Sequence, residues 1–248
     1  MTPPPYPASS ASRDLASQAN AFAEDLNRTI TLIFGEETDT FESASLEDRV
    51  SIDNLRITMR RGGEPVLQVS ARYLLSLDHR SDFLRVAQSQ IRVVPVGVNR
   101  PVFRYEYEEG YEDGSPHPAA HVQFHGVHPD LQDVMSRAWR KKPRDADAPP
   151  DVTHLHFPVG GTRYRPCLED VLEMLLVEFK LDVACGRKAA LEVLADQRAT
   201  WRRRQLATVV RDDPETAIDA LVRLGYARPR LLPGVNQPPR HDEHLRRI

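Results

Sequence analysis

The chain has 248 residues, of which 40% are apolar and 28% charged, and its formal net charge is −3. This is the composition of an ordinary globular protein. No apolar run approaches the roughly 20 residues of a membrane-spanning helix, and the Pro- and Ser-rich start lacks the basic and apolar segments of a secretory signal. We therefore expect a cytoplasmic protein without a membrane partner.

Charge is distributed unevenly along the chain. Residues 1–49 carry nine acidic and three basic side chains, whereas residues 187–248 carry thirteen basic and eight acidic ones. Such a polarity is compatible with the two ends approaching each other, or with a basic end that meets an anionic partner. Only four of the 33 basic residues are Lys, a bias typical of a GC-rich bacterial genome, so the number of Arg residues alone does not indicate phosphate binding.

The first predicted element is a helix from an N-cap at Ser12 to about Phe34, after a disordered start. Apolar residues recur there at spacings of three and four, which gives a helix one apolar stripe. Gly35 ends the helix, and an acidic, polar loop is predicted as far as about Asp48.

The pattern changes to strict alternation between Val50 and His125. In the segment VLQVSARYLLSL, apolar and polar residues alternate, and Arg61-Gly62-Gly63-Glu64 is typical of a hairpin turn. Because the connections between such segments are short, we expect an antiparallel meander. A helix at 130–140, a strand at THLHFPV (153–159) and an amphipathic helix opened by Pro166 follow.

The fold class is therefore predicted as α+β. We expect a curved antiparallel sheet of about five to seven strands, packed by the N-terminal helix and the helix at 166–180, with a helical C-terminal extension. The extension comprises a long helix at about 187–211 and a shorter one capped by Asp213 and stopped by Gly225. The predicted organisation is a disordered segment at 1–11, a core domain at 12–186, the extension at 187–228 and a loose tail at 229–248.

Histidines gather on the last two predicted strands. Alternation places His121, Gln123 and His125 on one face of AAHVQFH, and His154 and His156 on one face of THLHFPV. If the two strands are neighbours with matching faces, four imidazoles share one patch. The sequence leaves this adjacency open.

Three interpretations of this patch compete: solvated polar positions, acid–base catalysis on a phosphodiester, and a metal site that would use Glu106 or Asp151. The metal site lacks HExxH spacing or paired cysteines, and we expect no metal and no cofactor. The catalytic hypothesis uses neutral and protonated imidazoles on RNA or a nucleotide. The residues that it assigns as acid–base groups are His121, His125, His154 and His156. The phosphate ligands are Arg104, on the polar face of the preceding strand, and Arg163 and Arg165, near the N-terminus of the helix at Pro166.

Short motifs add three resemblances. HVQF and HLHF resemble the layout of two-histidine phosphoesterases, but Gln123 and His156 stand where that family has Ser or Thr, so its activity is not carried over. Residues 100–125 resemble TumE-like toxin–antitoxin proteins, and residues 100–180, with HLHFPVGGTRYRPCLEDVLEMLL, resemble uncharacterised actinobacterial proteins.

These resemblances imply nucleic-acid or defence biology. The leading hypothesis is a bacterial toxin or defence-type protein that acts on RNA or a nucleotide through the histidine face. The alternative is a non-catalytic antitoxin, adaptor or assembly subunit, which would bind a protein partner through its basic C-terminal helices.

Overall fold

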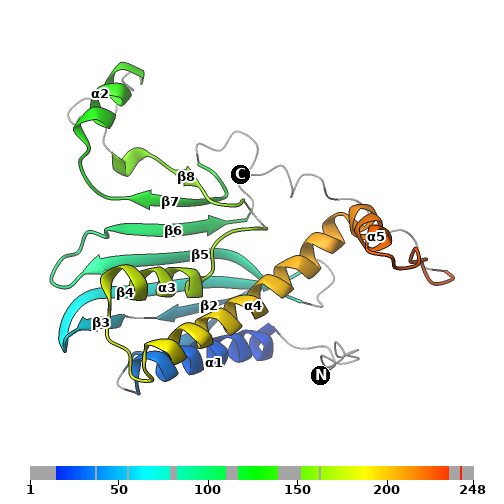
Figure 1. Cartoon of the computed structure of the whole chain (residues 1–248), viewed down its shortest axis with the longest axis horizontal. Coiled ribbons are helices and arrows are strands. Elements are labelled where there is room, and N and C mark those ends of the chain that lie inside the picture. The colour runs from blue at the N-terminus through cyan, green and yellow to red at the C-terminus, as the bar shows by residue number, and fades with distance from the viewer. Residues whose placement is uncertain are drawn as a thin grey trace.

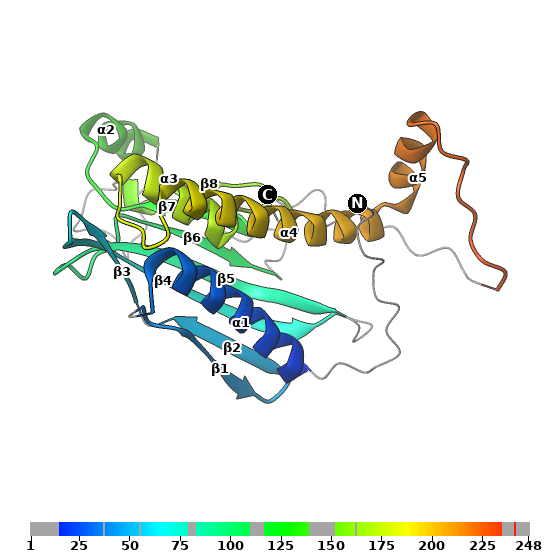
Figure 2. The same ribbon diagram turned by 60° about the horizontal axis from the view of Figure 1, so that its bottom comes forward.

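The protein is an α+β fold in which one antiparallel sheet is covered on one face by helices from both ends of the chain (Figures 1 and 2). The computed structural model describes residues 15–36, 38–54, 56–78, 83–109, 117–138, 152–161, 163–234 and 241. The predicted fold class is confirmed.

The sheet has eight strands in the order β1-β2-β4-β5-β6-β7-β8, and β3 pairs with the same long strand β4 as β2 does. Their bounds are β1 Phe41–Leu46, β2 Arg49–Asn54, β3 Ile57–Arg61, β4 Glu64–Leu77, β5 Leu84–Pro95, β6 Phe103–Glu108, β7 Ala120–Phe124 and β8 Phe157–Pro158. All the pairs in this sheet are antiparallel, as the short connections predicted.

The hairpin between β3 and β4 illustrates how the sequence determines the register. Gly62 and Gly63 have φ angles of 61° and 84°. Two consecutive positive φ angles belong to the two-residue turn that matches the twist of the flanking strands, and glycine adopts them without steric strain. Arg61 therefore pairs with Glu64.

The helices lie over one face of the sheet. Their bounds are α1 Leu15–Phe34, α2 Pro129–Ala138, a 3-10 turn η1 Val152–His154, α3 Leu168–Phe179, α4 Arg187–Asp212 and α5 Pro214–Arg223. Helices α1, α3 and α4 close the core against the apolar side of the strands, with Ile30, Leu172 and Leu194 buried to 2% exposure or less. Figure 2 shows these three helices together on one side of the sheet.

Two predictions about the sheet need correction. The segment 41–46 was expected to be part of a loop, yet it forms the edge strand β1; five of its six residues are exposed, so no alternation marks it in the sequence. The segment THLHFPV was expected to be a full strand. Instead it begins as η1, and only Phe157 and Pro158 pair with β7.

The C-terminal helices differ in how they pack. The first half of α4 contributes Ala190 and Leu194 to the core, so the expected extension at 187–228 shares the core of the preceding region. Helix α5 has the predicted Asp213 cap, which accepts a hydrogen bond from the Thr216 N–H, but it buries no residue. Of its apolar residues, Ala217 and Ile218 are half-buried, and Leu221 and Val222 are exposed. The N-cap at Ser12, Asp151 and the segments 1–11, 235–240 and 242–248 lie outside the described residues.

Candidate functional site

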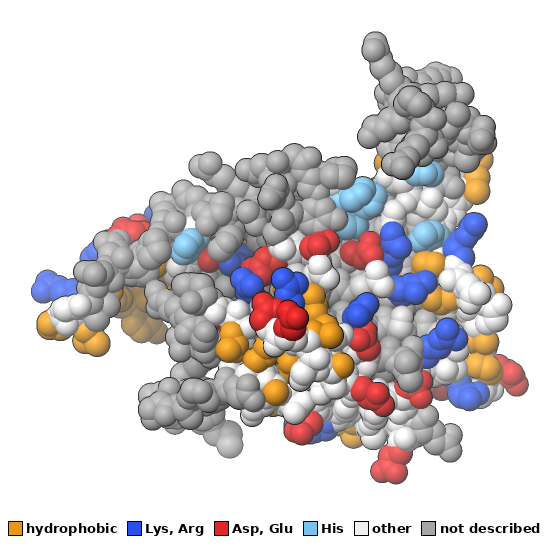
Figure 3. Space-filling model, turned by 180° about the vertical axis from the view of Figure 1, so that it is seen from behind, with side chains coloured by type: hydrophobic (Ala, Val, Ile, Leu, Met, Phe, Trp, Pro, Cys, Tyr) orange, Lys and Arg blue, Asp and Glu red, His pale blue; other side chains and the backbone are white. Residues whose placement is uncertain are grey.

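One face of the sheet is left uncovered by α1, α3 and α4, and the side chains that β6 and β7 place on it are polar. Apolar residues of β6 and β7 face the helices, so the alternate positions face the other way. On this open face Glu106 lies between its register partners Gln90 of β5 and His121 of β7. Figure 3 shows histidine side chains beside acidic and basic ones on this side of the molecule.

Three imidazole rings are in mutual contact at the β7–β8 edge of this face. The ring centroids of His117 and His156 are 3.7 Å apart, those of His121 and His156 are 4.7 Å apart, and those of His117 and His121 are 6.1 Å apart. We call these three residues the histidine cluster. Strands β7 and β8 are neighbours, so the adjacency that the sequence left open exists.

His121 is the buried member of the histidine cluster, with 5% of its surface exposed. Its Nδ1 lies 3.0 Å from the carbonyl oxygen of Pro118, and its Nε2 lies 3.2 Å from Oε2 of Glu106. Both partners are acceptors when the carboxyl is ionised, and only a doubly protonated imidazole can donate to both. Both ring nitrogens of His121 are therefore engaged by neighbouring groups, which suits this residue to hold the histidine cluster in place.

Glu106 is bound from three sides. Its Oε1 accepts a hydrogen bond of 2.7 Å from Gln90, and its Oε2 lies 3.0 Å from Nε of Arg104 as well as facing His121. Burial acts to raise the pKa of Glu106, but the hydrogen bonds from His121 and Gln90 and the charge of Arg104 outweigh it, so the pKa is lowered. Glu106 is thus an ionised anchor for the histidine cluster.

His156 is half-buried, as His117 is, and its ring nitrogens make no hydrogen bond to any described residue. Burial, and then the charges of His117 and His121, lower its pKa to about 4. His156 is therefore neutral at pH 7. Its unprotonated nitrogen can accept a proton, as a general base does, and the lowered pKa makes it a weaker base than an ordinary imidazole.

The other two predicted histidines lie at the margins. His154 is in η1 and exposed, and His125 follows the end of β7 and is half-buried. Neither takes part in the ring contacts of the histidine cluster among the described residues. The structure instead adds His117, which the sequence hypothesis omitted because it lies in a Gly-, Asp- and Pro-rich loop without periodicity.

The predicted phosphate ligands are separated by the sheet. Arg104 is on the open face beside Glu106. Arg165 is on the opposite, helix-covered side, where its guanidinium carbon lies 3.7 Å from the ring centre of Tyr107. Arg163 forms an ion pair with the buried Asp212 at 2.5 Å. Arg163 is therefore bound to the end of α4 and Arg165 packs on β6, so both are engaged on the side of the sheet opposite the histidine cluster.

The start of α3 was expected to offer free N–H groups to a phosphate. Asp170, inside the first turn of the helix, instead accepts a hydrogen bond of 3.0 Å from the backbone N–H of Cys167. Its carboxylate provides the negative charge that a helix N-terminus favours. The predicted convergence of this helix end with the histidine strand is therefore not found.

A further polar atom on the open face lacks a partner. Gln123 is 5% exposed, and its Nε2 donates to the carbonyl oxygen of Thr153, but its Oε1 has no hydrogen-bond partner in the described protein. A buried acceptor left without a partner costs about 1–3 kcal/mol. Such an atom beside a cluster of imidazoles marks a place where a ligand can donate a hydrogen bond.

Comparison with protein-family models, curated proteins and solved structures finds no match for this chain. Within the described residues, no group of three or more His, Cys, Asp and Glu side chains is arranged to hold a metal ion. None of the described helices combines the length and apolarity required to cross a bilayer.

Proposed function

We propose that this protein is a bacterial toxin or defence-type protein that acts on RNA or a nucleotide through the histidine cluster. The observation that carries the proposal is the contact of three imidazole rings beside the Glu106–Arg104 pair, on the sheet face that the core helices leave open. The resemblance of residues 100–125 to TumE-like proteins supports the same class of function.

The chemistry follows from the different surroundings of the rings. Neutral His156 takes the proton from a ribose 2′-hydroxyl, and that oxygen attacks the adjacent phosphorus to form a 2′,3′-cyclic phosphate. The 5′-oxygen leaves with a proton donated by His117, whose ring lies against that of His156. Because the two rings lie in contact, a base and an acid can act on the two oxygens bound to one phosphorus atom.

The remaining residues position the reacting groups. His121, held by Glu106 and the Pro118 carbonyl, packs its ring against His156 and fixes its orientation. Arg104 provides positive charge for the phosphoryl oxygens at the same edge. No metal ion takes part in these steps.

The test is cleavage of a short single-stranded RNA by the purified protein, with the products analysed for 2′,3′-cyclic phosphate ends. His156→Gln removes the base and should lower the cleavage rate by about 100-fold or more, the usual effect of losing a general acid or base. The all-deoxy oligonucleotide should not be cleaved because it lacks the attacking hydroxyl.

A matched control is His128→Asn. His128 is exposed beside the start of α2 and outside the histidine cluster, and Asn is accepted at helix starts. This variant should cleave RNA at the wild-type rate. Absence of cleavage by the wild-type protein, or an undiminished rate in His156→Gln, would refute the proposed activity.

A second candidate function has its own supporting observation. The apolar residues of α5 and of the segment after it are exposed in an unusual number: Leu221, Val222, Leu224, Tyr226, Leu231 and Leu232 each have 38–76% of their surface exposed. Exposed apolar groups of this kind are typical of protein contact sites. An antitoxin, adaptor or assembly subunit would use them to bind a protein partner.

Truncation after Asp213 tests the second candidate. It removes α5 and leaves Ala190 and Leu194 of the core in place, whereas truncation at residue 186 would remove both. The truncated protein should have the same free energy of unfolding as the full chain. It should fail to bind a purified partner that the full chain binds. Retained binding rejects this candidate.

A further inference from the structure

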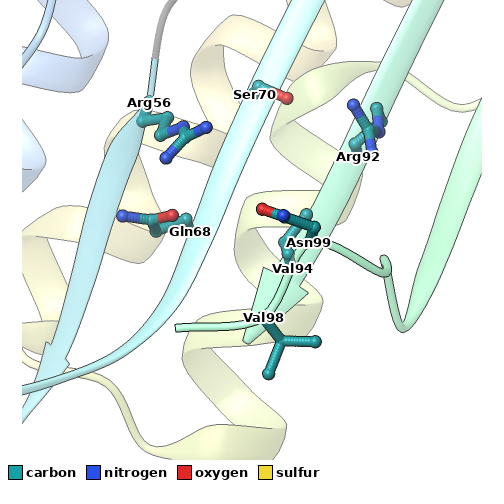
Figure 4. A pocket seen from close by; sticks show the side chains of 7 residues that line it. All are labelled: Arg56, Gln68, Ser70, Arg92, Val94, Val98 and Asn99. Atoms are coloured by element: carbon teal, nitrogen blue, oxygen red, sulfur yellow. The ribbon is translucent and has the colours of Figure 1, made fainter. Parts of the chain in front are cut away.

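The open face of the sheet has a hollow of about 260 Å³ two strands away from β7. It is lined by Arg56, Gln68, Ser70, Arg92, Val94, Val98 and Asn99, which come from the start of β3, from β4 and β5, and from the turn after β5 (Figure 4). Binding sites for small ligands begin at about 300 Å³. The hollow is therefore of a size for a phosphate group with part of the molecule that carries it.

Two cations of this hollow have no counter-charge in the described protein. Neither Arg56 nor Arg92 forms an ion pair or hydrogen bond with another described residue, and Nε of Arg92 is buried without a partner. Arg72 follows Ser70 on the same face of β4. Unlike Arg56 and Arg92 it has a counter-charge, because its Nε lies 3.0 Å from Asp53. The free positive charge of this face is thus concentrated in the hollow.

The register of the sheet increases this charge. Arg92 lies directly opposite Arg104 across the β5–β6 pair. Like charges at directly opposite positions of neighbouring strands repel, and an anion between them removes the repulsion. Figure 4 shows Arg56 and Arg92 on either side of Ser70, with Gln68 next to Arg56 and Asn99 below Ser70. The side chains of Ser70, Gln68 and Asn99 provide hydroxyl and amide groups that can donate hydrogen bonds to oxygen.

The hollow and the histidine cluster lie on one line across the sheet. Ser70 pairs with Arg92, Arg92 with Arg104, and Arg104 with Gln123. His156 continues this row because Phe157, the next residue, pairs with Val122. Three strand spacings, about 14 Å, separate Arg92 from His156. A short oligonucleotide spans this distance.

We propose that the hollow is a phosphate-binding subsite, which holds a phosphate group of the same RNA chain whose scissile bond lies at His156. The identity of the ligand rests on the proposed function, whereas the binding of a phosphate group rests on Arg56 and Arg92. Between the two ends, Gln123 Oε1 accepts a hydrogen bond from a hydroxyl or amino group of the chain.

Titration of the full-length protein with inorganic phosphate tests the hollow by itself. Backbone amide signals of Ser70, Arg92 and Asn99 should shift in two-dimensional NMR spectra as phosphate is added. Arg92→Gln should weaken phosphate binding about 10- to 100-fold, since it removes a charge-assisted hydrogen bond. Arg72→Gln is the matched control on the same face, and it should bind phosphate like the wild type because Arg72 is paired with Asp53.

The outcomes separate this inference from the proposed function. Phosphate binding that depends on Arg92 supports the subsite even if no RNA is cleaved. The inference is overturned if the wild-type protein binds no phosphate at a phosphate concentration of about 10 mM, since a specific site binds more tightly than this. Equal affinity in Arg92→Gln and the wild type also overturns it, including the case in which RNA is cleaved through His156.

Discussion

The low pKa of His156 predicts how its protonation lowers the stability of the fold in acid. In the unfolded chain this imidazole takes up a proton near pH 6.5, whereas in the fold its pKa is about 4. Between these two values the unfolded state binds more protons than the folded state, so stability falls as the pH falls through this window. Above pH 6.5 the ring is neutral in both states and has no such effect.

The size of the effect follows from the gap between 6.5 and about 4. At about 1.36 kcal/mol for each pH unit the gap corresponds to about 3.4 kcal/mol for a fully desolvated group. His156 is only half-buried, and solvent screens its charge, so we expect a loss of about 1–2 kcal/mol in the free energy of unfolding.

Urea unfolding followed by circular dichroism, at about pH 7.5 and about pH 4.5, measures this loss. His156→Gln cannot take up the proton, so its stability should fall by about 1–2 kcal/mol less than that of the wild type between the two pH values. His128→Asn should follow the wild type. If His156→Gln and the wild type lose the same stability, the surroundings that we ascribe to this ring are wrong.

Two further predictions concern single residues, and urea unfolding at neutral pH checks both. Glu106→Gln leaves His121 without the carboxylate that faces its Nε2 and should lower the free energy of unfolding by about 1.5–3 kcal/mol; an unchanged value would show that the pair does not hold the cluster. Gly160→Ala should lower the free energy of unfolding by more than about 1 kcal/mol. Gly160 has a φ of 77°, and a Cβ there would lie 2.3 Å from the carbonyl oxygen of Tyr164. As a control, Gly126→Ala should leave the free energy of unfolding unchanged, because its Cβ meets no atom within 4 Å.

The alternation of residues predicted the part of the site that lies on strands. His121 is on the expected polar face, and the strand that carries it neighbours the segment of His156. His117 was not predicted because the residues of a loop show no periodic pattern of apolar and polar types. Its position depends on how the loop before β7 folds back. Only the tertiary structure brings its ring against His156.

Proximity in sequence was a poor guide for the arginines. Arg163 and Arg165 follow β8 closely, but the chain crosses from the open face to the helix-covered face between them and His156, and a buried carboxylate and an aromatic ring bind them there. Arg92, by contrast, was not singled out, because its meaning depends on the absence of a partner and on its register with Arg104. Neither property can be read from a single sequence.

The arrangement of the helices also bears on synthesis of the chain. The apolar face of the sheet is covered by α1 from the beginning of the chain and by α3 and α4 from its last third, and Leu194 is the last of the buried core residues. At about 5–20 residues per second, roughly 5–20 s pass on the ribosome between completion of β5 and the appearance of Leu194. During that interval α3 and then the first half of α4 are still missing from the cover of the sheet, so apolar side chains of the sheet stay exposed on the nascent chain.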